Sequence, residues 1–102
     1  MTAEELCKTL GLALVGDGTR EIRRVGCADV ADEYTLAIVH SERELIATRA
    51  RVVLSEPQIV ITDKTILYCS YGELAAMWVR AIRTPIKAGL YPDYDQIPTQ
   101  TM

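Results

Sequence analysis

The rarest residues of this 102-residue sequence exclude several kinds of site. There is a single histidine, His40, so no metal ion can be bound by two histidines of this chain. The three cysteines, Cys7, Cys27 and Cys69, are odd in number, lie far apart and contain no C-x-x-C pair. This pattern argues against a zinc site and favours reduced thiols in a cytoplasmic protein. We therefore expect neither a bound metal nor a cofactor.

Positive charge and long apolar runs are also scarce. Lysine and arginine total 11 against 14 aspartate and glutamate, which gives a net charge of -3 and a pI near 5.1. Such a chain has no overall attraction for nucleic acid or for an anionic membrane. No apolar run approaches the roughly 18 residues that a membrane span needs, and the first residues are acidic where a signal peptide would be basic. We expect a soluble protein without a membrane span that does not bind nucleic acid.

The first quarter of the chain predicts a helix followed by a hairpin. Thr2 and Glu5 form a capping box that opens an amphipathic helix over about 3–10. Strands over 12–15 and 20–25, joined by a Gly-Asp-Gly turn, predict the hairpin. This turn lacks the longer glycine spacing and the lysine of a phosphate-binding loop.

The centre of the chain predicts a strand, a helix and a second strand. Residues 34–39 are apolar enough to form a strand buried on both faces, and 51–54 form a second such run. Between them, Ser41 and Glu44 repeat the capping-box pattern. His40 therefore lies where a strand passes into a helix, at the edge of an α/β sheet where ligands commonly bind.

The C-terminal half predicts two more strands, a third helix and a tail. The strands are expected over 58–61 and 65–69, and Ser70 with Glu73 forms a third capping box. The helix that follows runs to about residue 83 and carries an apolar stripe of Tyr71, Leu74, Met77, Trp78, Ala81 and Ile82. Residues 1–84 thus predict one small α/β domain with a mixed sheet of about five or six short strands and three helices. Residues 85–102 lack periodicity and predict a C-terminal tail.

This order of segments resembles a known domain over roughly residues 2–83. The matching segments are Leu14 to Gly18, Ile22, Val25, Ala28, the strand that ends at His40, Ala50 to Val53, Thr65 to Tyr68, and Leu74 to Met77. They are similar to the N-terminal, non-repeat domain of UDP-3-O-acylglucosamine N-acyltransferase, a lipid A biosynthesis enzyme of bacteria. More distantly, they are similar to the N-terminal uridine-binding domains of Mur ligases.

The resemblance implies a function of the binding type. In the acyltransferases this domain grips the uracil and ribose of the nucleotide-sugar substrate through a Phe-x-x-Asn-Pro-x-Tyr motif. The matching positions here are Ala37, His40, Ser41 and Arg43, so both stacking aromatics are absent. The catalytic histidine of that family lies in a hexapeptide-repeat β-helix, and this sequence contains no such repeat. The resemblance therefore implies a non-catalytic accessory module that binds a uridine nucleotide or nucleotide sugar, and not an N-acyltransferase acting alone.

The candidate ligand-binding residues are His40, Ser41, Arg43 and Tyr71. Backbone N–H groups at the start of a helix favour an anion or a polar ligand edge. Each residue also has an ordinary structural interpretation, since Ser41 can be only a helix cap, His40 an exposed strand end and Tyr71 a packing residue. If the pocket is vestigial, the alternative function is protein interaction or oligomerisation, with the tail packed on a partner or on a second copy.

A cysteine nucleophile is the remaining chemical possibility. It would need Cys27 or Cys69 to lie beside His40 in space. Cys69 precedes a predicted helix, whose N-terminus would stabilise a thiolate, although a core position is the commoner role for a cysteine at a strand end.

Overall fold

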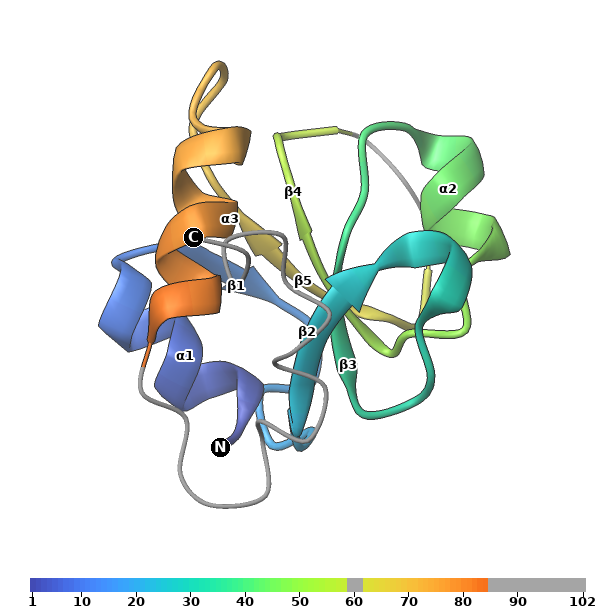
Figure 1. Ribbon diagram of the computed structural model, residues 1–102, viewed down its shortest axis with the longest axis horizontal. Helices are drawn as coiled ribbons and strands as arrows, with labels where there is room; N and C mark the ends of the chain where they lie inside the picture. Colours follow the sequence, from blue (N-terminus) through green and yellow to red (C-terminus); the bar gives the residue numbers. More distant parts are fainter. Residues whose placement is uncertain (59–61, 85–102) are drawn as a thin grey trace, which may run out of the picture.

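The computed structural model describes residues 1–58 and 62–84. Within these ranges lie five strands, which form one mixed sheet in the order β1-β5-β4-β3-β2 (Figure 1). The pairs β2–β3, β3–β4 and β4–β5 are parallel, and β1 pairs antiparallel with β5. The tail predicted over 85–102, and most of the strand predicted over 58–61, lie outside the described residues. The strands are β1 (Ala13–Val15), β2 (Arg24–Cys27), β3 (Thr35–Ile38), β4 (Val52–Ser55) and β5 (Thr65–Tyr68).

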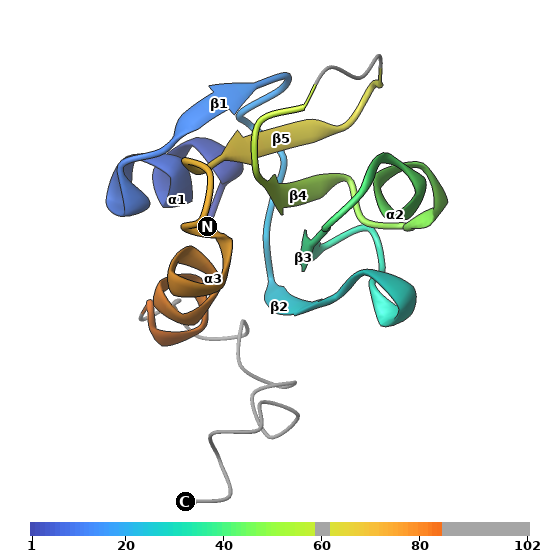
Figure 2. The same cartoon turned by 90° about the horizontal axis from the view of Figure 1, so that it is seen from above.

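Helices cover both faces of this sheet. Helices α1 (Ala3–Leu10) and α3 (Leu74–Arg83) lie on one face, and α2 (Glu42–Ala47) lies on the other beside the 3₁₀ turn η1 (Ala28–Val30) (Figure 2). The described part of the chain is therefore an α/β domain with a mixed sheet and three helices, as predicted, and its elements form three layers. Within it, no helix has the length and apolar character that crossing a membrane would require.

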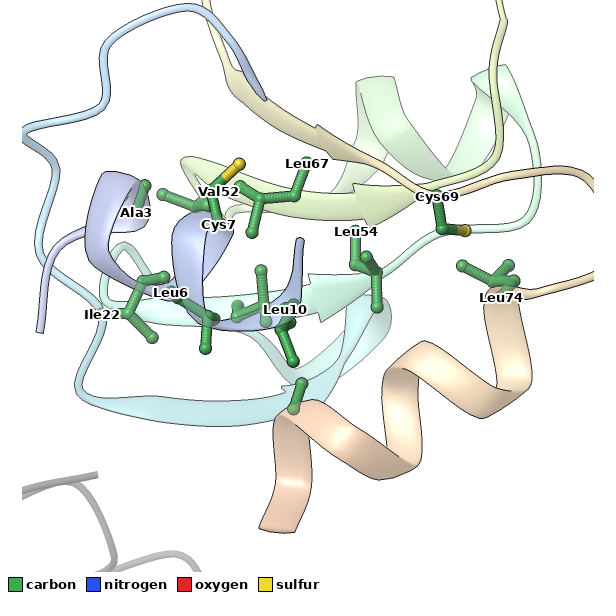
Figure 3. Packing of buried hydrophobic residues seen from close by; sticks show 12 residues of the cluster. Ala3, Leu6, Cys7, Leu10, Ile22, Val52, Leu54, Leu67, Cys69 and Leu74 are labelled. Atoms are coloured by element: carbon green, nitrogen blue, oxygen red, sulfur yellow. The ribbon is translucent and has the colours of Figure 1, made fainter. Parts of the chain in front are cut away.

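The sheet is buried on both faces because its central strands β3 and β4 are apolar over 36–38 and 52–54, and the polar residues Thr35 and Ser55 at their ends are buried as well. Side chains of a strand alternate between faces, so Leu36 of β3 packs with α1 and α3 while its neighbour Ala37 packs on the α2 side. The same alternation divides Leu54 from Val53 on β4. Figure 3 shows the larger cluster, in which Leu6 of α1 and its neighbours face the sheet.

The predicted hairpin is wrong. The strand after the Gly-Asp-Gly turn does not return along β1, which pairs with β5, but crosses to the opposite edge of the sheet as β2. Residues 20–22 instead pair with the N-terminus: Ile22 N–H donates to the Met1 carbonyl at 2.7 Å, and Ala3 N–H donates to the Arg20 carbonyl at 2.9 Å. This path buries Ile22 completely, which a two-strand hairpin could not do.

The predicted start of the third helix is also wrong. Glu73 is the N-cap of α3 and makes no side-chain capping bond. Ser70 belongs to the preceding turn, where its carbonyl accepts the Glu73 N–H at 3.0 Å. Gly72 in that turn has φ +82°, a left-handed conformation that interrupts the helix and leaves Ser70 too far away to cap it. Tyr71 consequently lies outside the helix and is 74% exposed.

Candidate functional site

Three chemically active side chains lie on neighbouring strand ends at the carboxyl edge of the sheet. Cys27 on β2 pairs in register with Ile38 on β3, which pairs with Leu54 on β4. Residues that pair in register point to the same face, and two residues further along a strand the face is the same again. His40 and Glu56 therefore project to the α3 face, next to Cys27. This edge of a parallel sheet is the usual ligand-binding position.

These three residues line one hollow between the strand ends and α3, which we call the α3 hollow. Its volume is about 590 Å³. The wall on the α3 side is formed by Leu74, Ala75, Trp78 and Val79, and the other lining residues are Cys27, Ile38, His40, Glu56 and Gly72. A smaller recess of about 100 Å³ shares His40, Glu56 and Leu74 with it and extends toward Tyr71 and Gln58. The described residues that line the two hollows include no lysine or arginine.

His40 is held by a carboxylate from the first turn of α2. The Nδ1 atom of His40 lies 3.4 Å from Oε1 of Glu44, and the same oxygen accepts the His40 backbone N–H at 2.6 Å. The imidazole side chain is 64% exposed. A carboxylate at Nδ1 favours the tautomer with the proton on that nitrogen, which leaves Nε2 as the proton acceptor.

Ser41 is a helix cap. Its Oγ accepts the Glu44 N–H at 3.2 Å, as the capping-box pattern predicts. The reciprocal bond differs from the prediction, because the Glu44 carboxylate bonds to His40 N–H rather than to Ser41 N–H. The capping-box pattern therefore predicted the start of α2 correctly. Its acidic residue, Glu44, is also the residue whose carboxylate contacts His40.

Glu56 is a site residue that the sequence analysis missed. Its Oε2 accepts the Gly72 N–H at 2.6 Å, which ties the end of β4 to the turn before α3. The Tyr71 hydroxyl donates to the Pro57 carbonyl at 3.1 Å across the same gap. The available signal was strand alternation, because Glu56 follows the buried Leu54 by two residues and so shares its face.

The structure brings together only part of the predicted ligand set. His40 and Tyr71 both line the smaller recess, and His40 also lines the α3 hollow. Arg43 is exposed on α2 and lines neither of the two hollows. The set His40, Ser41, Arg43 and Tyr71 thus divides into two residues at the hollows, one cap and one exposed cation.

The cysteines differ sharply in their surroundings. Cys69 is 3% exposed and lies beside Leu74 in the core (Figure 3), and burial raises the pKa of its thiol. Cys7 is 7% exposed, and burial raises its pKa as well. The predicted stabilisation of Cys69 by a helix N-terminus is wrong, because α3 begins only at Leu74. Cys27 is exposed and lines the α3 hollow with His40.

No group of three or more His, Cys, Asp or Glu residues could hold a metal ion within residues 1–58 and 62–84. Comparison with known protein families and with curated proteins found no family model and no relative that matches this chain.

Proposed function

We propose that this domain binds a small ligand with a flat ring and a polar edge in the α3 hollow. A uridine nucleotide or nucleotide sugar is the ligand of this class that the sequence resemblance implies. The observation that carries the proposal is the combination of an apolar wall around Trp78 with His40 and Glu56 at the carboxyl edge of a parallel sheet. Binding of this kind requires no bond to be made or broken.

The lining residues suit the separate parts of such a ligand. Trp78 lines the hollow from α3 and, in this proposal, takes the place of the stacking side chains missing at positions 37 and 43; stacking contributes about 1 to 3 kcal/mol per base. The Glu56 carboxylate accepts hydrogen bonds from a ring N–H or from ribose hydroxyls, and His40 offers Nε2 as a second polar contact. Because no described lining residue is cationic, phosphates would extend into solvent, where Arg43 is the cation closest to His40 in sequence.

The single tryptophan provides a direct assay. Trp78 is the only tryptophan of the chain and lines the hollow, so its fluorescence reports occupancy. We expect saturable quenching by UDP-N-acetylglucosamine and UMP, weaker quenching by AMP, and a matching rise in melting temperature. Ligand at a hundred times its dissociation constant stabilises the folded state by about 2.7 kcal/mol.

Variants locate the site within this assay. His40→Ala and Glu56→Gln should weaken uridine binding, whereas Glu42→Gln, which removes an exposed charge from the first turn of α2, should not. If none of the three compounds at millimolar concentration changes the fluorescence or the melting temperature, the nucleotide proposal is wrong.

A second candidate function is protein interaction through the opposite layer. Val30 on η1 is 72% exposed and Ile46 on α2 is 64% exposed, and η1 packs against α2. Exposed apolar side chains on neighbouring elements favour an interface. Light scattering across a concentration series tests this candidate: self-association that Ile46→Ser abolishes would support it, and a monomer at every concentration would exclude homo-oligomerisation.

A further inference from the structure

We propose that Cys27 is a nucleophile with His40 as its general base, and that the α3 hollow accepts a thioester or similarly activated acyl compound with an apolar acyl group. The inference goes beyond ligand binding and does not require a nucleotide to bind. Both proposals concern the same hollow. The experiment for the nucleophile therefore uses no nucleotide, and it can succeed even if no nucleotide binds.

The placement of Cys27 and His40 is the first support. Cys27 pairs with Ile38, the last residue of β3, and the chain just after it stays beside β4, because Val39 N–H donates to the Leu54 carbonyl at 3.0 Å. His40 follows Ile38 by two residues and lines the α3 hollow together with Cys27. The thiol and the imidazole therefore share one hollow, in which a staggered rotamer of Cys27 can direct its Sγ toward His40. Cys27 is exposed, whereas Cys7 and Cys69 are buried.

The surroundings of His40 are the second support. Oε1 of Glu44 lies 3.4 Å from Nδ1 and also accepts the His40 N–H, so the carboxylate holds both the backbone and the ring. This arrangement of nucleophile, base and orienting carboxylate recurs in enzymes that transfer acyl groups. Glu44 would act as a positioning residue, because it touches His40 and does not line the α3 hollow.

The lining of the hollow is the third support, and it indicates the substrate class. Trp78 and Val79 of α3 present apolar surface in the same hollow as the Cys27 thiol, with Leu74 and Ala75 beside them. Such a wall accommodates an apolar acyl chain and gives no cation for a charged one. The polar residues of the hollow, His40 and Glu56, come from the strand ends, where the reacting carbonyl would lie.

The proposed reaction is transfer of the acyl group to Cys27 followed by hydrolysis. His40 Nε2 takes the thiol proton as Cys27 Sγ attacks the thioester carbonyl, so the new carbon–sulfur bond forms on Cys27. The bond to the leaving thiol breaks, and that thiolate takes the proton back from His40. Water then attacks the S-acyl group, with His40 as base, and releases the carboxylic acid and the free Cys27 thiol.

The test is acetylation by p-nitrophenyl acetate, followed by nitrophenol release and by peptide mass mapping of the three cysteines. We expect a burst with the acetyl group on Cys27, faster than acetylation of the same chain unfolded in urea. General-base catalysis typically contributes about 10² to 10⁴-fold, so His40→Gln should slow acetylation of Cys27 by about 100-fold or more.

Matched variants separate catalysis from structure. Glu44→Gln and Glu42→Gln each remove one charge from the first turn of α2, and only the first should slow acetylation. Complete labelling of Cys27 by a disulfide reagent in the native His40→Gln chain would show that the thiol stays accessible. The proposal is overturned if native Cys27 reacts no faster than the cysteines of the unfolded chain, or if His40→Gln leaves the acetylation rate unchanged.

Discussion

Asp32 should stabilise the fold mainly through its charge. Its Oδ1 accepts the Tyr34 N–H at 2.9 Å and the Thr35 hydroxyl at 2.9 Å, and its Oδ2 pairs with Arg24 of β2. These contacts join the start of β3 to the edge strand that carries Cys27. Asp32→Asn keeps the size of the side chain and removes the charge, so it isolates the electrostatic contribution.

The expected cost follows from the number of contacts and their exposure. Hydrogen bonds to a charged group contribute about 1.5 to 3 kcal/mol each when well shielded. The Asp32 side chain is 44% exposed, so solvent screens the charge and Asn retains part of the bonding. We expect Asp32→Asn to lower the free energy of unfolding by about 1 to 2 kcal/mol at neutral pH. Asp29→Asn, an exposed acid of the same segment, should change it by less than about 0.5 kcal/mol.

The same interaction predicts a pH dependence with a definite sign. Burial alone would raise the pKa of Asp32, but the bonds from Tyr34 and Thr35 and the charge of Arg24 outweigh it and hold the pKa below 3.8. A carboxylate with a lowered folded-state pKa stabilises the fold above its unfolded pKa, and the contribution disappears as pH falls through the folded pKa. Urea unfolding should therefore show the Asp32→Asn cost shrinking in acid. A loss of unfolding free energy that is the same at neutral and at acid pH, or that equals the loss caused by Asp29→Asn, would refute this reasoning.

Two further predictions concern a turn and the core. Gly16 has φ +101°, and an added Cβ would lie 3.0 Å from the Lys64 carbonyl oxygen, so Gly16→Ala should destabilise the fold by more than about 1 kcal/mol. Gly11→Ala, also at positive φ but with no atom within 4 Å of the new Cβ, should cost less in the same denaturation assay. Leu54→Ala should lower the unfolding free energy by about 2 to 5 kcal/mol, since Leu54 is fully buried, whereas the 53% exposed Val15 should tolerate alanine. Equal losses for Leu54→Ala and Val15→Ala would contradict the packing described here.

The site was only partly accessible from the sequence. His40 was predicted because a strand-to-helix junction can be recognised from a short apolar run followed by a cap. Glu56 was missed because strand alternation indicates only the face of the sheet that it shares with Leu54, and the hollow on that face forms only where α3 packs. The sequence could not show which of Cys27 and Cys69 is exposed, since each is a cysteine at a strand end. Packing against Leu74 buries Cys69, while Cys27 stays exposed.

The sequence by itself determined the first two helices and the two buried strands of the central strand-helix-strand unit. Capping by Thr2 and Ser41, and the apolar runs 36–38 of β3 and 52–54 of β4, act over a few residues and can be recognised wherever they occur.

Only the tertiary structure decided how the strands are ordered and which side chains meet. β1 pairs with β5 rather than with the strand that follows it, because Ile22 is buried against the N-terminus, a contact between distant parts of the chain. The α3 hollow likewise combines four separate segments, from β2, the ends of β3 and β4, and α3. Strand pairing is set by the burial that the whole sheet achieves, and no local pattern contains that information.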